Sequence, residues 1–202
     1  YGAGYGHLVE AIKIKNPEIV VGYDVSKNFQ IESEKNKILT SSWEEVINNA
    51  PYDLINLDDV IDHLIGEKPD DVLKKLKTIM KPDGAIKMRC HPFISRHGGH
   101  VYKKINKAYI HLVLTKKELI ELGFDFQDYP TILVTTPLKT YGEFIEKAGL
   151  KILYQNIVSD PAEKFFLYGN IASRIKNNLK INDLLIPQMG VQFVDYILNN
   201  QM

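Results

Sequence analysis

Apolar residues in the first 90 positions of the chain follow two spacings that alternate along the sequence. Short continuous apolar runs predict strands at 19–24, 37–41, 52–58 and 85–90. Helical spacing predicts helices at 8–16, from the capping residue Ser42 onward, at 60–65 and at 72–80, the last one broken by the turn at 81–84. Strands that alternate with helices in this way indicate βαβ units, and therefore a mostly parallel sheet covered on both faces.

The second half of the chain is less regular. A polar stretch rich in His, Arg, Lys and Gly occupies 91–109, and Thr115 with Glu118 forms a capping box for a helix that Gly123 ends. Strands are predicted at 131–135, 150–158 and 164–171, the last two as an antiparallel pair, and helices at 140–149 and near 191–198. We interpret residues 1–202 as a single domain with a cap or acceptor segment at about 91–140 and a tail from about 174.

Composition and charge exclude several classes of protein. The chain has 202 residues, 45% of them hydrophobic and 25% charged, which excludes wholesale disorder. Its 25 basic and 25 acidic residues balance to a net charge of zero, so we expect no broad attraction for nucleic acid. A single cysteine, Cys90, fits a reducing compartment, and no apolar run approaches the roughly 20 residues of a membrane helix. We therefore expect a cytoplasmic protein with no membrane partner.

Three glycines at the start of the chain, Gly2, Gly4 and Gly6, form a G-x-G-x-G pattern that opens the first predicted helix. The backbone N–H groups of such a loop can bind an anion or let a ligand approach the main chain closely. Asp24 ends the next strand 18 residues after Gly6, where an acid holds a ribose diol in dinucleotide-binding folds. The alternative is a structural tight turn. Because a turn of this kind normally follows a buried strand, we expect a strand ahead of Tyr1.

Four motifs occur in order within about residues 1–90: 1–6, 22–24, 52–55 together with 59–64, and 80–84. Together they resemble the class I S-adenosylmethionine-dependent methyltransferases, which typically show a D-x-G-x-G-x-G loop, an acid after the second strand, an E-H-like fourth-strand region and an L-K-P-G-G turn. The resemblance implies a doubly wound, mostly parallel sheet with an antiparallel last strand. It also implies methyl transfer from S-adenosylmethionine to a small acceptor, by analogy with enzymes of this fold.

The resemblance also implies roles for individual residues. Gly2, Gly4 and Gly6 would line the methionine part of the cofactor and Asp24 would bind the ribose hydroxyls. Ser42 and Trp43 would border the adenine, and Asp58 would close the pocket. The alternatives are a partly buried aromatic for Trp43 and a charge favourable to a helix N-terminus for Asp58 and Asp59. The chain departs from the family pattern in its absent first strand, in Asp83 in place of a glycine, and in its long segment after the fifth strand.

The histidine-rich segment at 89–102 begins at the end of the predicted strand at 85–90, which is the fifth strand if the one expected ahead of Tyr1 is counted. This position is beside the expected donor methyl group. We predict that His91, His97 and His100 supply a general base for a hydroxyl or ammonium acceptor. Arg89 and Arg96 could clamp a carboxylate or phosphate on that acceptor, with His111 also contacting it. Two alternatives are a metal site without a familiar zinc spacing and a polar lid whose histidines only make hydrogen bonds. We assign no residue as a metal ligand, and the sequence leaves the choice between these roles open.

Two rival functions make different structural predictions. A nicotinamide-dependent oxidoreductase would use the same glycine loop and Asp24, and its last strand would be parallel. A non-catalytic scaffold with this fold would have a glycine loop that is closed or disordered. No N-P-P-Y motif follows the strand at 52–58, which argues against methylation of a flipped DNA base. The sequence leaves the acceptor and the oligomeric state open.

Overall fold

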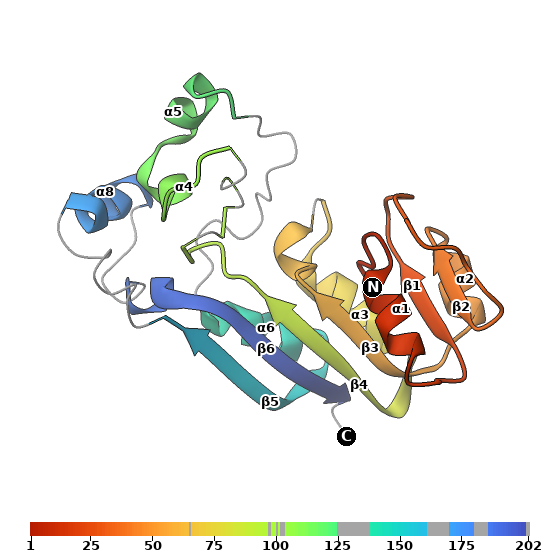
Figure 1. Cartoon of the computed structure of the whole chain (residues 1–202). Coiled ribbons are helices and arrows are strands. Elements are labelled where there is room, and N and C mark those ends of the chain that lie inside the picture. The colour runs from red at the N-terminus through yellow and green to blue at the C-terminus, as the bar shows by residue number, and fades with distance from the viewer. Residues whose placement is uncertain are drawn as a thin grey trace.

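The strands form two sheets that lie next to each other (Figure 1). The computed structural model describes residues 1–64, 66–96, 98–99, 101, 104–124, 138–160, 170–179 and 186–200. The smaller sheet pairs β1 (Val20–Tyr23) with β2 (Lys37–Thr40), in parallel. The larger sheet has the order β3 (Tyr52–Asp58), β4 (Met80–Cys90), β6 (Val191–Asn200) and β5 (Leu150–Ser159).

The helices connect these strands and build a cap beyond one end of the larger sheet (Figure 1). The α-helices are α1 (His7–Lys13), α2 (Trp43–Asn48), α3 (Pro69–Lys77), α4 (Ile110–Val113), α5 (Lys116–Glu121), α6 (Leu138–Lys147) and α8 (Asn170–Leu179). Two short 3-10 helices are η1 (Ile61–His63) and η3 (Ile186–Gly190). None of the helices in the described part of the chain is long and apolar enough to cross a membrane.

The direction of the last strand confirms the predicted fold class. β3 and β4 run parallel with Asp58 opposite Arg89, whereas β6 is antiparallel to both β4 and β5. A parallel last strand, which the oxidoreductase alternative requires, is therefore not present in this sheet. A mixed sheet whose last strand runs antiparallel to its neighbours is the one that the methyltransferase resemblance implies.

The C-terminal part of the chain differs from the sequence prediction. Residues 191–198, predicted as a helix, form most of β6, and β6 is an antiparallel partner of β5. Asn170 begins helix α8, while residues 161–169 and the predicted strand at 131–135 lie outside the described residues. The burial of Val194, Tyr196 and Leu198 alternates with period two, so the packing of this segment is that of a strand.

Two shorter predictions also need correction. The predicted helix at 60–65 is only the single 3-10 turn η1. The predicted break at 81–84 lies inside β4, because the strand starts at Met80 and its register with β3 jumps from Met80 opposite Tyr52 to Ala85 opposite Leu54. A bulge therefore absorbs the Pro82-containing turn without ending the strand.

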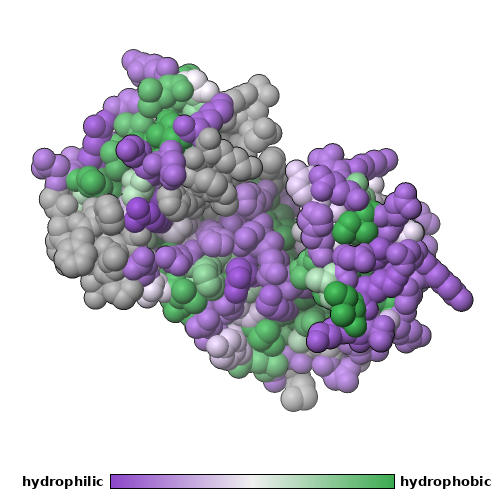
Figure 2. Space-filling model, in the orientation of Figure 1, coloured by the Kyte–Doolittle hydropathy of each residue, from purple (hydrophilic) through white to green (hydrophobic). Residues whose placement is uncertain are grey.

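The core lies on one face of the larger sheet. Alternate residues of β4, including Ile86 and Met88, are fully buried and face α3 and α6, which lie behind the sheet in Figure 1. Helix α3 buries Val72 and Leu76, and its charges complement the helix dipole, with acids in the first turn and lysines in the last. The other face carries the odd-numbered residues of β4, among them Lys87 and Arg89, and a largely hydrophilic band crosses the middle of the molecule in Figure 2.

The cap is built from two segments that are distant in the sequence. Helices α4 and α5 pack with α8, where the side-chain amide of Asn178 donates to the carbonyl oxygen of Val113 at 2.6 Å. Arg174 forms an ion pair with Glu118, which is also the second member of the predicted capping box with Thr115. Both segments lie beyond the end of the larger sheet at which β4 finishes, at the upper left of Figure 1.

Candidate active site

The glycine loop adopts a backbone conformation that glycine favours. Gly2, Gly4 and Gly6 have φ angles of +69°, +55° and +94°, in the left-handed region. A Cβ atom on Gly4 would have no neighbour within 4 Å, so the space beside this residue is open. The loop is therefore neither closed nor filled by side chains at Gly4, in contrast to what the scaffold alternative predicts.

Asp24, at the end of β1, is tied to the glycine loop. One of its carboxylate oxygens accepts a hydrogen bond from the backbone N–H of Gly4 at 2.7 Å. The other accepts from the backbone N–H and the hydroxyl of Ser26, at 2.9 and 2.8 Å. Asp24 is half-buried, and the oxygen that accepts from Gly4 has a second lone pair that these hydrogen bonds do not use. The structure thus brings the predicted glycines and the predicted acid together.

The loop is seated between the two sheets. The backbone nitrogen of Tyr1 donates to the carbonyl oxygen of Asn56 on β3 at 3.1 Å, and the N–H of Ala3 donates to that of Tyr23 on β1 at 2.9 Å. Gly2 lies so close to the side chain of Val60 that a Cβ atom there would collide with it. The loop therefore lies beside the carboxyl ends of both β1 and β3.

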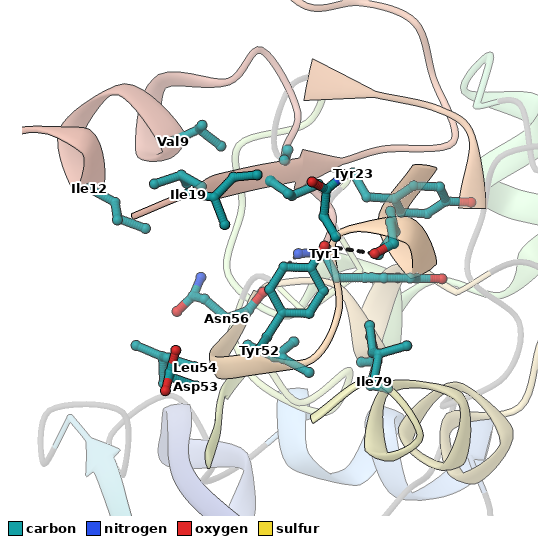
Figure 3. Close-up of a pocket in the computed structure, with 18 of the residues that line it drawn as sticks. Tyr1, Val9, Ile12, Ile19, Tyr23, Tyr52, Asp53, Leu54, Asn56 and Ile79 are labelled. Carbon is teal, nitrogen blue, oxygen red and sulfur yellow. Dashed lines mark hydrogen bonds between the residues drawn. The ribbon is translucent and has the colours of Figure 1, made fainter. Parts of the chain in front are cut away.

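Below the loop, a cavity of about 580 Å³ separates β1 from β3. Figure 3 shows Val9, Ile12 and Ile19 on one side, Leu54 and Asn56 on the other, and Tyr1 between them. Among the described strands, β1 pairs only with β2 and β3 only with β4, so each has one backbone edge toward this gap. The cavity is thus a mainly apolar slot between the two sheets. Gly2, Trp43 and Asp58, which the sequence assigns to the cofactor site, also line it, whereas Asp24 does not.

Trp43 belongs to an aromatic cluster. Its ring packs edge-on against Tyr23, with ring centroids 5.5 Å apart, and against Tyr1 at 6.2 Å. The ammonium of Lys75 lies 4.0 Å from the Trp43 ring centroid, a cation–π contact. Ser42 is the N-cap of α2, as its spacing to Glu45 predicts, and its hydroxyl accepts from the backbone N–H of Glu45 at 3.4 Å.

The two acids at the end of β3 face different partners. The carboxylate of Asp58 pairs with Lys87 at 3.2 Å across the sheet. The backbone of Asp59 is left-handed, with φ +55°, and its carboxylate lies 3.2 Å from Nε2 of His91. The parallel register of β3 and β4 creates this second pair, because Asp58 opposite Arg89 places the residues that follow both strands side by side. The sequence analysis assigns His91 and Asp58 to the site but not Asp59, because the contact of Asp59 with His91 depends on this register.

A third carboxyl group close to this pair, that of Asp62 in η1, is buried. Burial raises the pKa of Asp62 to about 7, and the nearby charge of Asp59 acts in the same direction. Hydrogen bonding from backbone groups and the charge of His91 oppose this shift. The Asp62 carboxyl group can therefore hold a proton near neutral pH. Its charge state interacts electrostatically with Asp59 and His91.

Arg89 is held on the open face of the sheet. Its Nε donates to Asp195 at 2.7 Å, and its guanidinium lies 4.3 Å from the ring centroid of Phe193, which also contacts the His91 ring at 5.8 Å. The hydrogen bond from Arg89 lowers the pKa of Asp195 and raises that of Arg89. The guanidinium is thus charged and fixed in orientation beside His91.

Two of the remaining predicted site residues can be placed: Arg96 follows β4, and His111 lies in α4. His111 is buried, its Nε2 lies 2.7 Å from the carbonyl oxygen of Phe93, and Gly99 packs directly against its ring. Arg96 is half-buried and its carbonyl oxygen accepts from the N–H of Tyr109 at 2.9 Å. His97 and His100 lie outside the described residues. Cys90 is buried, and burial raises its thiol pKa well above the ordinary value.

No group of three or more His, Cys, Asp or Glu that could hold a metal ion occurs among the residues whose positions are described. The metal alternative concerned the histidines of the segment at 89–102 together with His111. Of these histidines, His91 and His111 can be placed. They lie in different environments, since His91 is half-exposed at the end of β4 and His111 is buried in the cap.

Comparisons with known proteins agree with this architecture. Residues 1–88 match the family described as "Methyltransferase domain". Comparison with curated proteins found no match. Solved structures of similar fold include a SAM-dependent methyltransferase from Archaeoglobus fulgidus, which is 19% identical with a TM-score of 0.55, over 98% of this chain and 82% of that one.

Two further solved structures extend the comparison. The cyclopropane synthase MmaA2 from Mycobacterium tuberculosis is 15% identical with a TM-score of 0.56, over 98% of this chain and 75% of that one. The plantazolicin methyltransferase BpumL, crystallised with a desmethylPZN analog and SAH, is 14% identical with a TM-score of 0.51, over 99% and 75%. The resemblance to the class I S-adenosylmethionine-dependent methyltransferases is thereby confirmed: the chain has their fold, and its first 88 residues match the methyltransferase domain.

Proposed function

We propose that this protein transfers a methyl group from S-adenosylmethionine to a small acceptor that carries a carboxylate or phosphate. The observation that carries the proposal is the contact between Gly4 and Asp24, which joins an open glycine loop to an acid at the carboxyl end of β1. In open α/β sheets, ligands bind in the crevice beyond these strand ends. The family match over residues 1–88 covers this loop and this acid.

The residues present fit the cofactor. The left-handed loop at Gly2–Gly6 leaves space beside Gly4 for the methionine part, and the Asp24 oxygen that accepts from Gly4 has a second lone pair for a ribose hydroxyl. Trp43 borders the adenine in this assignment, and Asp58 closes the pocket at the end of β3. When bound, S-adenosylmethionine supplies an electrophilic methyl group whose bond to sulfur breaks as the bond to the acceptor forms.

The acceptor would bind between His91 and the cap. An in-line displacement depends mainly on positioning, and the cap supplies walls that can hold the acceptor and exclude water. His91 lies at the end of β4, half-exposed, where it can take the proton of a hydroxyl or ammonium group. Arg89, beside His91, supplies a fixed positive charge for an anionic group on the acceptor, a role also assigned to Arg96. His97, His100 and His111 remain predicted site residues.

Calorimetry with S-adenosylhomocysteine tests this function. The protein is expected to bind the compound, and Asp24→Ala is expected to weaken binding about 10- to 100-fold, because a hydrogen bond to a charged group contributes about 1.5–3 kcal/mol. Asp53→Asn is the matched control, since Asp53 lies at the other end of β3 and pairs with Lys81 at the surface. Absence of binding, or equal binding by Asp24→Ala, would overturn the assignment.

We also propose that the strand expected ahead of Tyr1 occupies the cavity between β1 and β3, where it would pair in parallel with both. The two open strand edges, the apolar lining and the hydrogen bonds from residues 1–3 to both sheets support this placement. Hydrogen exchange at the amides of β1 and β3 tests it, by comparing residues 1–202 with a longer protein that includes upstream residues. Slower exchange in the longer protein is expected, and equal exchange would contradict the proposal.

A further inference from the structure

The Asp59–His91 pair is positioned by the backbone of both strands. The N–H of Asp59 donates to the carbonyl oxygen of Arg89 at 3.1 Å, which extends the β3–β4 hydrogen bonding by one residue. Asp59 then adopts a left-handed conformation, uncommon outside glycine and tolerated mainly by Asn and Asp. Such strained residues cluster at functional sites. The conformation directs the Asp59 carboxylate to Nε2 of His91, 3.2 Å away.

We infer that Asp59 is a positioning residue that holds His91 in the tautomer needed for a general base, an inference that rests on the methyltransferase function proposed above. In a neutral imidazole one nitrogen carries the proton and the other accepts one. A carboxylate at Nε2 favours the proton there, which leaves Nδ1 as the proton acceptor. The same logic orients the histidine of other acid–base sites, where the carboxylate stabilises the charged ring without taking its proton.

The proton balance of the step is simple. As the methyl carbon bonds to the acceptor atom, the proton of that atom moves to Nδ1 of His91, and the ring becomes an imidazolium. The Nε2–H stays hydrogen-bonded to Asp59, whose negative charge stabilises the new positive charge at 3.2 Å. The electron pair of the broken methyl–sulfur bond remains on sulfur, so the coproduct is a neutral thioether.

The other groups described near His91 do not orient its ring as Asp59 does. The Phe193 ring contacts the imidazole without a hydrogen-bonding atom, and Arg89 is held by Asp195. Asp62 acts on His91 electrostatically and through the His91 backbone, and one of its carboxylate oxygens lies 4.0 Å from Nε2 of His63. Of the carboxylates described around the His91 ring, Asp59 is the one with a short side-chain contact to it.

Nuclear magnetic resonance of ¹⁵N-histidine-labelled protein tests the inference without an acceptor. His91, assigned by comparison with His91→Gln, is expected to show the Nε2–H tautomer as its main neutral form. Asp59→Asn keeps a residue that tolerates the left-handed backbone and removes the charge, so the tautomer preference should be lost. Asp195→Asn removes a charge on the same sheet face and should leave the tautomer unchanged, as should Asp62→Asn.

The outcomes separate this inference from the proposed function. A main Nδ1–H tautomer in the parent protein would overturn the positioning role. So would a preference that survives Asp59→Asn, or one that is lost in Asp62→Asn. Calorimetry with S-adenosylhomocysteine on the same parent sample measures the proposed function separately. Failure to bind the compound would overturn the methyltransferase proposal while the tautomer result still reports whether Asp59 orients His91.

Discussion

The backbone N–H of Gly4 donates to the carboxylate of Asp24 at 2.7 Å, and this bond joins the glycine loop to the end of β1. The same bond has two consequences. It fixes the loop in a conformation that exposes Gly4 to open space, and it turns one oxygen of Asp24 toward the loop. A change at either residue should therefore alter cofactor binding more than it alters folding.

Gly4→Ala should weaken binding of S-adenosylhomocysteine at least 10-fold while lowering the stability of the fold by only about 1–2 kcal/mol, the cost of a left-handed non-glycine residue. The matched control is Gly123→Ala, because Gly123 has φ +79° and equally open surroundings but lies after α5 in the cap. Calorimetry and thermal unfolding measure the two effects. Equal binding by both variants would mean that the ligand does not lie over Gly4.

Gly22→Ala should destabilise the protein by about 1–3 kcal/mol through overpacking. A Cβ atom on Gly22 would lie 2.6 Å from Cγ2 of Val9 and 2.7 Å from Cδ2 of Leu39, both nearer than van der Waals contact allows. Gly142→Ala is the counterpart in α6, where a Cβ atom meets nothing within 4 Å. It should raise the free energy of unfolding by about 0.5–1 kcal/mol, and denaturant titration of both variants checks the opposite signs.

The buried Asp62 should make stability depend on pH. Its pKa is raised from 3.8 to about 7 in the folded protein, so the native state holds a proton that the unfolded state has released. The free energy of unfolding should therefore fall as pH rises from about 4 to about 7, by up to a few kcal/mol. Asp62→Asn should remove this part of the slope. Asp53→Asn, at an exposed carboxylate, should keep it, and a parent slope that survives Asp62→Asn would contradict the prediction.

Trp43 provides an intrinsic probe because it is the only tryptophan in the chain. If its assignment beside the adenine is correct, saturating S-adenosylhomocysteine should change its fluorescence emission. Lys75→Met, which removes the ammonium 4.0 Å from the ring centroid, should change the emission of the free protein but leave a ligand-dependent signal. Binding detected by calorimetry with unchanged emission would place the adenine away from Trp43.

The parts of the fold that depend on local pattern were predictable from the sequence. The strands at β1, β2 and β3 and the capping box at Thr115 follow from short apolar runs and from side-chain to backbone bonds within a few residues. β6 was not predictable in this way. Val191, Val194 and Leu198 fit a helical spacing as well as a strand, and only pairing with β4 and β5 on both edges selects the strand.

The candidate site likewise has a part that local sequence pattern predicts and a part that depends on tertiary structure. The glycines and Asp24 belong to local motifs, and the structure brings them into contact as the motif implies. The Asp59–His91 pair depends on the register between β3 and β4, and the role of α8 in the cap depends on a hydrogen bond between Asn178 and Val113, 65 residues apart. Such contacts arise from tertiary structure, and the spacing of residues along one segment does not encode them.

The cap of α4, α5 and α8 comes from two stretches of chain that interrupt the sheet after β4 and before β6. Length changes within these stretches leave the hydrogen bonds of β1 to β4 untouched. The first 88 residues, which match the methyltransferase domain, can thus stay constant during evolution while insertions and deletions reshape the cap. If the acceptor binds against the cap, as proposed above, such changes would alter the choice of acceptor without affecting the cofactor.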